Sequence, residues 1–381
     1  MLGDPSVPWR EGWAPWLRGI EARARDFGLL PLARWAAALA EDIEVASAPA
    51  SPLEQAVARV AAQPIATETL AEGPFFRLLR FAPLGGSAGP RILLVAPCSG
   101  YAACVLAELA TVLASAGRLA VLEWKDARLV PVAAGRLDAA EQAALCGAAV
   151  ARFAPHAVVA LSQSGDAALA AVLAARSATD RALPRALVLL GSPVVPEAAP
   201  TAWQRALARV PETTLATFCL ERVGPGWPGE GRLVFPGVLQ LATVAASEPL
   251  LFGAVRLRAF SERLEGENGP GCRALRDLYA IQDVPGELWL DLVARLRRPK
   301  TELSEQARAA GRGLALLTVE AGADALVGRG QTHAVQARLE PEGALRARLT
   351  LPGAGHHDLF TGPVFRALLA PRLRAFLAAA R

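Results

Sequence analysis

The 381-residue chain contains few residues of several chemically informative types. It has four histidines and five cysteines. Its only lysines are Lys125 and Lys300, so nearly all of its basic residues are arginines. Its 40 basic and 36 acidic residues give a net charge of only +4. A protein that wraps a polyanion needs a larger surplus of positive charge. We therefore expect no nucleic-acid partner.

Long hydrophobic runs are also missing. The longest uncharged stretches, residues 92–107 and the segment around 236–247, are interrupted by Pro, Gly or polar residues. A transmembrane helix needs about 20 consecutive apolar residues, so we expect no transmembrane segment. The N-terminus, MLGDPSVPWREGW, lacks the basic and apolar regions of a secretory signal. We expect a cytoplasmic protein.

The cysteines form no CxxC pair and are scattered along the chain. They are Cys98, Cys104, Cys146, Cys219 and Cys272. This spacing fits reduced thiols better than disulfides or a zinc site. No stretch shows metal-ligand spacing or a glycine-rich phosphate loop, so we expect neither a metal nor another cofactor.

Hydrophobic residues, at 53% of the chain, are abundant enough for a large core. The first 70 residues or so have a helical pattern, in which Trp9, Trp13 and Trp16 recur at three- to four-residue spacing on one face. This stripe packs either on the main domain or against a second copy or another apolar partner. The pattern leaves both alternatives, including a homo-oligomer, open.

The middle of the chain alternates short apolar runs with helical stretches, which predicts a mostly parallel α/β sheet with helices on both faces. The expected strands are residues 92–96, 119–124, 157–161, 186–190, 314–319 and 345–351. Residues 193–299 lack this alternation and are rich in Pro, Gly and aromatic residues, which indicates an inserted cap. The predicted organisation is an N-terminal helical extension (1–70), a core in two parts (71–192 and 301–381) and a cap (193–300).

The segment Val-Val-Ala-Leu-Ser-Gln-Ser-Gly, residues 158–165, predicts a nucleophile elbow. In such an elbow a serine sits on a sharp strand-to-helix turn, and its neighbours two positions away must be small. Around Ser162 these neighbours are Ala160 and Ser164. Ser164 is the weaker candidate, because Asp166 at its plus-two position is bulky. The alternative is an ordinary serine bonded to nearby backbone.

A serine nucleophile needs a base and an orienting acid, which should follow later in the chain with the acid first. Asp324 comes after the expected strand 314–319, and a Gly-rich loop with His356 and His357 comes after the strand 345–351. We predict Asp324 as the acid and His356 as the base, with His357 facing elsewhere.

The remaining parts of the predicted site are donors and apolar contacts. The backbone N–H groups of Gln163 and of Cys98 or Ser99 would form an oxyanion hole. Aromatic and leucine side chains of the cap either fill its own core or line a substrate groove, with Trp227 and Leu239 as our candidates for substrate binding. The full set is Trp203, Phe218, Trp227, Phe235, Leu239 and Leu241.

From residue 72 to the C-terminus the chain resembles the intracellular poly(3-hydroxybutyrate) depolymerases, a family of the α/β-hydrolase superfamily. The resemblance rests on blocks in order, of which WKDAR and VxPGxLQL are the most specific. The others are GPFFRLLRF, ILLVAPCSGYAA, VVALSQS, LVLLGSPV, LLTVEAGADALVGRGQT and PGAGHHDLFTG. The family's nucleophile, acid and histidine fall on Ser162, Asp324 and His356. The family members use cysteine followed by Gln-Pro, whereas this chain has Ser-Gln-Ser.

The resemblance implies an α/β-hydrolase fold with an inserted cap. It also implies hydrolysis of ester bonds in a storage polyester through an acyl-enzyme. The partner would be a polyester granule or a hydroxyalkanoate oligomer, and the protein would work in the cytoplasm at the granule surface. Two alternatives remain: a small-ester esterase or thioesterase with the same machinery, and a non-catalytic protein of the granule coat.

Overall fold

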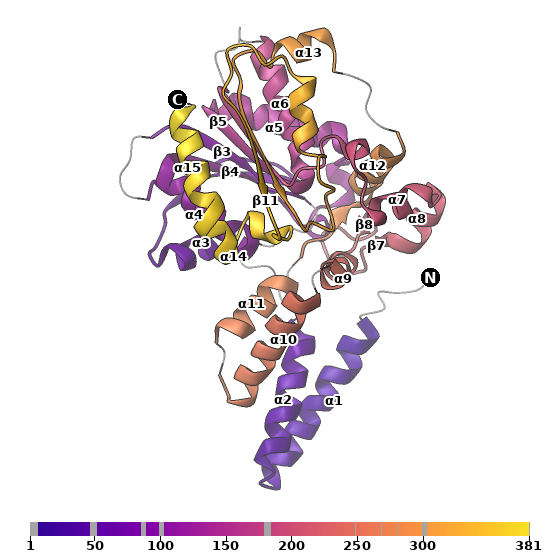
Figure 1. The fold of residues 1–381 in the computed structure, drawn as a ribbon. Helices are drawn as coiled ribbons and strands as arrows, with labels where there is room; N and C mark the ends of the chain where they lie inside the picture. Colours follow the sequence, from indigo (N-terminus) through magenta and orange to yellow (C-terminus); the bar gives the residue numbers. More distant parts are fainter. Residues whose placement is uncertain are drawn as a thin grey trace.

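The structure is a computed structural model of the chain, shown in Figure 1. It describes most of the sequence, with short gaps between the described ranges. These ranges are 7–45, 52–84, 89–98, 103–178, 184–247, 249–267, 269–279, 281–298 and 303–380.

An eight-stranded sheet forms the centre of the molecule, with the strand order β1-β2-β4-β3-β5-β6-β10-β11. The strands are β1 (Thr67–Glu72), β2 (Phe76–Phe81), β3 (Arg91–Val95), β4 (Arg118–Trp124), β5 (Ala157–Leu161), β6 (Ala186–Leu190), β10 (Ala315–Ala321) and β11 (Arg346–Leu351). Strand β2 runs antiparallel to both of its neighbours, and the strands from β4 to β11 are parallel. This order and direction are those of the α/β-hydrolase fold, as the sequence predicted.

The parallel strands form where the sequence has short, continuous apolar runs. Every residue of β5, β6 and β10 is buried, because helices cover both faces of the sheet. All six predicted strands are confirmed, with ends shifted by at most two residues. The prediction missed β1 and β2, and β1 lies partly inside the stretch that we expected to be helical. Strand β1 is largely exposed and has no buried face to give it an apolar pattern.

Helices pack on both faces of the sheet (Figure 1). On one face α4 (Ala103–Ala116) contacts α3 (Leu53–Ala61) and α15 (Ala370–Ala379). On the other face α5 (Ala139–Phe153) packs against α6 (Gly165–Ala178). Helix α5 is capped at its N-terminus by Asp138, whose side chain accepts hydrogen bonds from the N–H groups of Ala140 and Glu141.

The chain between the adjacent strands β6 and β10 forms a separate layer beside the carboxyl ends of the parallel strands. It has a small sheet of β7 (Glu221–Arg222), β8 (Leu233–Phe235) and β9 (Val284–Pro285). Its helices are α7 (Ala202–Arg209), α8 (Glu212–Cys219), α9 (Gly237–Ser247), α10 (Pro249–Leu264), α11 (Pro270–Tyr279) and α12 (Gly286–Arg297), and α13 (Glu305–Ala309) follows them. We call the segment from α7 to α12 the cap.

Helices α1 (Val7–Asp26) and α2 (Leu30–Val45) form a hairpin that projects from the body of the molecule (Figure 1). Helix α2 contacts α10 and α11, so the hairpin packs against the cap. The side chains of Trp9 and Trp13 lie outside the described set, and Trp16 is largely exposed.

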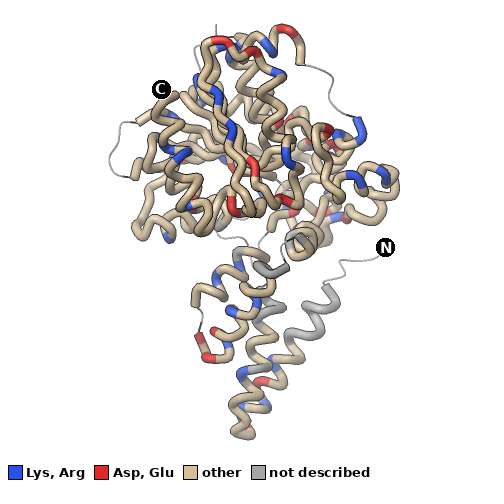
Figure 2. Tube along the Cα trace, viewed as in Figure 1, with Lys and Arg blue, Asp and Glu red and all other residues tan. Residues whose placement is uncertain are grey.

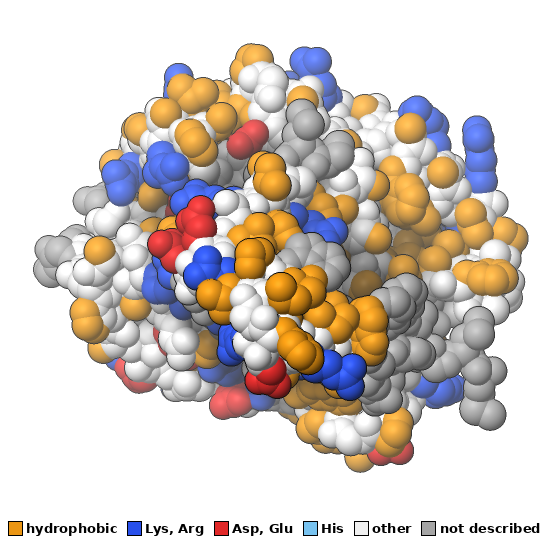
Figure 3. All heavy atoms as spheres, turned by 90° about the horizontal axis from the view of Figure 1, so that it is seen from below, with side chains coloured by type: hydrophobic (Ala, Val, Ile, Leu, Met, Phe, Trp, Pro, Cys, Tyr) orange, Lys and Arg blue, Asp and Glu red, His pale blue; other side chains and the backbone are white. Residues whose placement is uncertain are grey.

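The projecting end of the molecule carries apolar side chains at its surface, and Figure 3 shows hydrophobic atoms gathered on this side. Phe27, Leu29 and Leu30, at the turn between α1 and α2, are all more than half exposed. Among the described residues, no helix combines the length and the hydropathy needed to cross a bilayer. Charged residues of both signs are interspersed over the body and the hairpin (Figure 2).

Candidate active site

Ser162 lies at the turn between β5 and α6, directly after a fully buried strand. Its φ angle is +46°, in the left-handed region that side-chain-bearing residues rarely adopt. Such strain at a strand-to-helix turn is the mark of a nucleophile elbow, because it lifts the hydroxyl above the edge of the sheet. The backbone conformation therefore agrees with the predicted elbow.

The neighbours of Ser162 show why this turn needs small residues. Ala160 is fully buried in the sheet, and a Cβ atom at Gly165 would lie 2.4 Å from Cβ and Oγ of Ser192. Ser164 is also fully buried, and its hydroxyl donates to the carbonyl oxygens of Val95 and Leu161 at 3.0 and 2.8 Å. Ser164 therefore has a structural role, and its hydroxyl is occupied.

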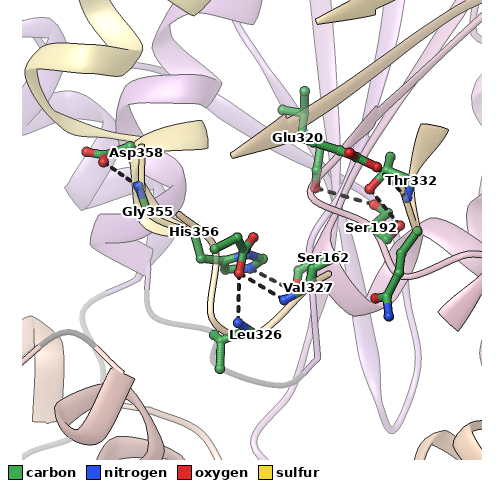
Figure 4. A network of polar contacts seen from close by, with 12 residues as sticks. Ser162, Ser192, Glu320, Leu326, Val327, Thr332, Gly355, His356 and Asp358 are labelled. Atoms are coloured by element: carbon green, nitrogen blue, oxygen red, sulfur yellow. Dashed lines mark hydrogen bonds and ion pairs between the residues drawn. The ribbon is translucent and has the colours of Figure 1, made fainter. Parts of the chain in front are cut away.

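His356 joins Ser162 to Asp324 across the carboxyl ends of three strands. Its Nε2 atom lies 3.1 Å from Oγ of Ser162, and its Nδ1 atom lies 2.6 Å from Oδ2 of Asp324. Figure 4 shows Ser162 and His356 pointing toward each other. A hydroxyl, an imidazole and a carboxylate in this order can remove a proton from the hydroxyl and stabilise the imidazolium that forms.

Asp324 is held by the turn that follows β10. Its Oδ1 atom accepts hydrogen bonds from the N–H groups of Leu326 and Val327 at 2.8 and 2.9 Å, which leaves Oδ2 for His356 (Figure 4). The Asp324 side chain is only 1% exposed, and burial by itself would raise its pKa. The charge and hydrogen bond of His356 and the two N–H groups outweigh burial, so the pKa lies below its ordinary value. Asp324 is therefore a carboxylate at neutral pH.

The loop after β11 positions His356 through its own contacts. The carboxylate of Asp358 accepts a hydrogen bond from the Gly355 N–H at 2.8 Å (Figure 4). Gly191 has a φ of +52°, and a Cβ atom there would lie 3.2 Å from the imidazole of His356 and 2.8 Å from Leu359. A glycine at this position thus lets the imidazole approach the sheet closely.

A second buried carboxylate fixes the chain that follows Asp324. Glu320 accepts hydrogen bonds from the N–H groups of Gly330, Thr332 and His333 at 2.7 to 2.9 Å. The Thr332 hydroxyl in turn donates to the carbonyl of Ser192, at the end of β6 (Figure 4). The segment after Asp324 is therefore tied to the neighbouring strand.

Ser162 and His356 open onto a pocket of about 260 Å³ between the core and the cap. Its wall is mainly apolar and includes Trp203, Phe235, Trp289, Leu292 and Phe360. Trp203 and Phe235 belong to the cap residues that we expected at a substrate groove. The pocket combines apolar walls with a few convergent polar groups, as small-molecule sites do.

A model of the family described as "PHB de-polymerase C-terminus" matches residues 191–381, which is half of the chain. The chain belongs to the PHB depolymerase family. This confirms the resemblance noted in the sequence, and it makes the protein a carboxylic ester hydrolase. The matched half contains the cap, Asp324 and His356, whereas Ser162 lies before it.

Solved structures also resemble this PHB depolymerase family member. An esterase of M. tuberculosis is 14% identical with a TM-score of 0.49, and the match covers 86% of this chain and 97% of that one. A soluble variant of the monoglyceride lipase of Saccharomyces cerevisiae is 12% identical with a TM-score of 0.49, and the match covers 83% of this chain and 96% of that one. No curated protein sequence matches the chain.

The predicted oxyanion donors of this depolymerase family member lie beside the elbow. The Cys98 N–H donates to the side-chain oxygen of Gln163 at 3.0 Å, and Gln163 donates to the amide oxygen of Gln142 at 2.6 Å. Ser99 lies outside the described residues. Burial, with a smaller effect of the Asp126 charge, raises the pKa of the Cys98 thiol to about 12, so this cysteine is no thiolate nucleophile.

The structure does not bring the two predicted substrate-binding residues to the pocket. Trp227 lies against the guanidinium of Arg128, 5.1 Å from the ring centre, and is not among the lining residues. Leu239 is partly exposed on α9, whose pocket-facing residues are Gln240 and Thr243. The sequence of α9, GVLQLATVAAS, has apolar residues on both sides of the helix, so its hydrophobic pattern does not distinguish the pocket-facing side.

The structure adds residues that the sequence did not single out. We expected His357 to face elsewhere, but it lines the pocket. A short helical turn begins at this residue and turns its side chain to the same side as His356. Gln142 holds the side chain of Gln163, and Arg295 of α12 lies 2.9 Å from Asp166 of α6. Among the described residues, no three His, Cys, Asp or Glu side chains are grouped so that they could hold a metal ion.

Proposed function

We propose that the protein hydrolyses the ester bonds of poly(3-hydroxybutyrate) or a related storage polyester, with Ser162, His356 and Asp324 as a catalytic triad. The observation that carries the proposal is the hydrogen-bonded chain from Ser162 to Asp324 at the mouth of an apolar pocket, in a member of the PHB depolymerase family.

The reaction has two halves. His356 takes the proton of Ser162 as Oγ attacks the ester carbonyl, and it returns this proton to the leaving alcohol. Asp324 holds the imidazole with Nδ1 protonated and stabilises its positive charge. Water, activated by the same histidine, then attacks the acyl-enzyme and releases the acid.

The developing oxyanion needs N–H donors. The Gln163 N–H follows the nucleophile directly, and the Cys98 N–H comes from the loop after β3, as in other elbows of this kind. The Cys98 N–H would give up its hydrogen bond to the Gln163 side chain and donate to the substrate oxygen instead. The reciprocal hydrogen bonding of Gln163 with Gln142 gives the displaced side chain a fixed place.

The apolar wall of the pocket favours a polyester segment, which has no charge along its length. The pocket volume of about 260 Å³ lies near the lower end of ligand pockets and fits a short segment of the chain. Work at the granule surface in the cytoplasm is part of the same proposal.

The test is clearing of amorphous polyester granules by wild type and Ser162→Ala, combined with fluorophosphonate labelling of the purified proteins. Ser115→Ala is a matched control, because Ser115 is an exposed serine of α4. We expect loss of clearing and of labelling in Ser162→Ala alone. Hydrolysis of soluble nitrophenyl esters without granule clearing would favour a small-ester esterase instead.

A further inference from the structure

The active-site pocket has one feature that polyester hydrolysis does not explain. Asp166 and Arg295 are the only aspartate, glutamate, lysine or arginine side chains among the described residues that line it. Asp166 lies in the first turn of α6, four residues after Ser162, and Arg295 reaches it from the cap helix α12. Charges are rarely placed in an apolar pocket without a partner for them.

The guanidinium of Arg295 is not fully satisfied by this pairing. Its Nη2 atom lies 2.9 Å from Oδ1 of Asp166, and the side chain is 17% exposed. The Nε and Nη2 atoms are both buried, and neither makes a hydrogen bond of good geometry with any described residue. Buried donors of a charged group are costly to leave unbonded. Nε and one terminal nitrogen form the fork that binds a carboxylate in a bidentate manner.

We propose that Arg295 binds the free carboxylate at the end of a hydroxyalkanoate chain. This inference rests on the proposed function, because it assumes that such a chain enters the pocket. A polyester chain has a single negative group, its terminal carboxylate. Apart from Asp166, the pocket suits an uncharged chain, so an arginine in its wall can distinguish the chain end from every other segment.

The chemistry of the polymer fixes the side of the scissile bond on which Arg295 acts. In a chain of hydroxy acids, the carboxyl end always lies on the alcohol side of each ester bond. Ser162 would form a bond to the carbonyl carbon, and the bond from that carbon to the ester oxygen would break. The leaving oxygen would take the proton from His356.

The released alcohol would be a short hydroxy acid whose carboxylate is bound at Arg295. Water would then free the rest of the chain with a new carboxyl end, which can bind in turn. The predicted products are hydroxy acids removed from the carboxyl end, and the short acid leaves before the acyl-enzyme is hydrolysed.

The test compares a 3-hydroxybutyrate trimer with a free carboxylate and the methyl ester of the same trimer. For wild type we expect kcat/KM to favour the free acid by roughly 10- to 100-fold, the range for a hydrogen-bonded charge pair. In Arg295→Gln this ratio should fall to about one, whatever happens to the two separate rates.

Arg297→Gln is the matched control. Arg297 lies on the same helix, but its side chain donates to the carbonyl oxygens of Ala208 and Val210 within the cap. Loss of this arginine should leave the ratio of the two substrates as in wild type. Equal kcat/KM for acid and ester in wild type, or an unchanged ratio in Arg295→Gln, would overturn the inference.

Binding of the same two trimers to Ser162→Ala separates this inference from the proposed function. Tighter binding of the free acid, lost when Arg295→Gln is added, supports the carboxylate site even if wild type hydrolyses neither trimer. Equal binding of both trimers contradicts the site, even if granules are cleared.

Discussion

At the scale of single residues, the triad could be predicted because its members follow a rule of order and position. Ser162 follows β5 directly, Asp324 and His356 lie in the loops after β10 and β11, and the carboxyl ends of these parallel strands meet at one edge of the sheet. The sequence could not place Trp227 and Leu239, since no strand or period determines which side of the cap a residue faces. The sequence also did not single out Arg295 and Gln142, because their partners Asp166 and Gln163 lie in other parts of the chain.

The first prediction concerns Asp324→Asn. The asparagine oxygen can still accept from Leu326 and Val327, so the turn should remain intact. The group facing His356 would no longer be an anion and would favour the wrong imidazole tautomer. We expect kcat for a soluble ester to fall by about 10³-fold or more, with an unchanged circular dichroism spectrum. A loss of less than about tenfold would remove Asp324 from the triad.

At the scale of elements, short apolar runs predicted the parallel strands, whereas the antiparallel pair β1 and β2 at one end of the sheet was missed. The WKDAR block, which was specific but unexplained in the sequence, has a place in the structure. It lies at the end of β4, where Asp126 accepts from the N–H of Asp283 and Arg128 lies 3.3 Å from the Asp283 carboxylate. The block therefore joins the core to the chain just before β9 of the cap.

The second prediction concerns the pH dependence of this junction. Burial raises the pKa of Asp283 from 3.8 to about 7, with Arg128 opposing and Asp126 adding to the rise. The folded protein thus holds the proton more tightly than the unfolded chain, and the stability from this group is lost as pH rises from about 4 to 7.

Asp283→Asn replaces the titrating carboxyl group by an amide that does not titrate. The amide oxygen can still accept from the Gly237 N–H, which donates to Asp283 at 2.7 Å. Urea unfolding at about pH 5 and pH 8 should show that wild type loses more free energy of unfolding than the variant over this interval. Equal losses in both proteins would contradict the raised pKa.

At the scale of the whole molecule, the cap is fastened to the core. Arg232, just before β8, is 5% exposed and donates to the carbonyl oxygens of Val130, Pro131 and Gly135 of the core. Because these carbonyls have a cationic partner from the cap, the wall of the pocket is held in place over Ser162. The abundance of apolar residues in the sequence also has its explanation here, in a sheet covered on both faces and in the exposed tip of the hairpin.

The third prediction concerns Arg232→Met. It removes the donors from three buried or partly buried carbonyl groups, so the free energy of unfolding should fall by roughly 2 to 4 kcal/mol. Arg222→Met is the control, because Arg222 is exposed and donates to Gly231 within the cap. Its effect should stay within about 0.5 kcal/mol. Similar effects of the two substitutions would mean that Arg232 does not fasten the cap.

The central claim is that Ser162 is the nucleophile of a polyester hydrolase, and granule clearing by Ser162→Ala beside Ser115→Ala tests it most directly. The predicted result is no clearing above background by Ser162→Ala and wild-type clearing by Ser115→Ala. Full clearing by a folded Ser162→Ala protein would contradict it.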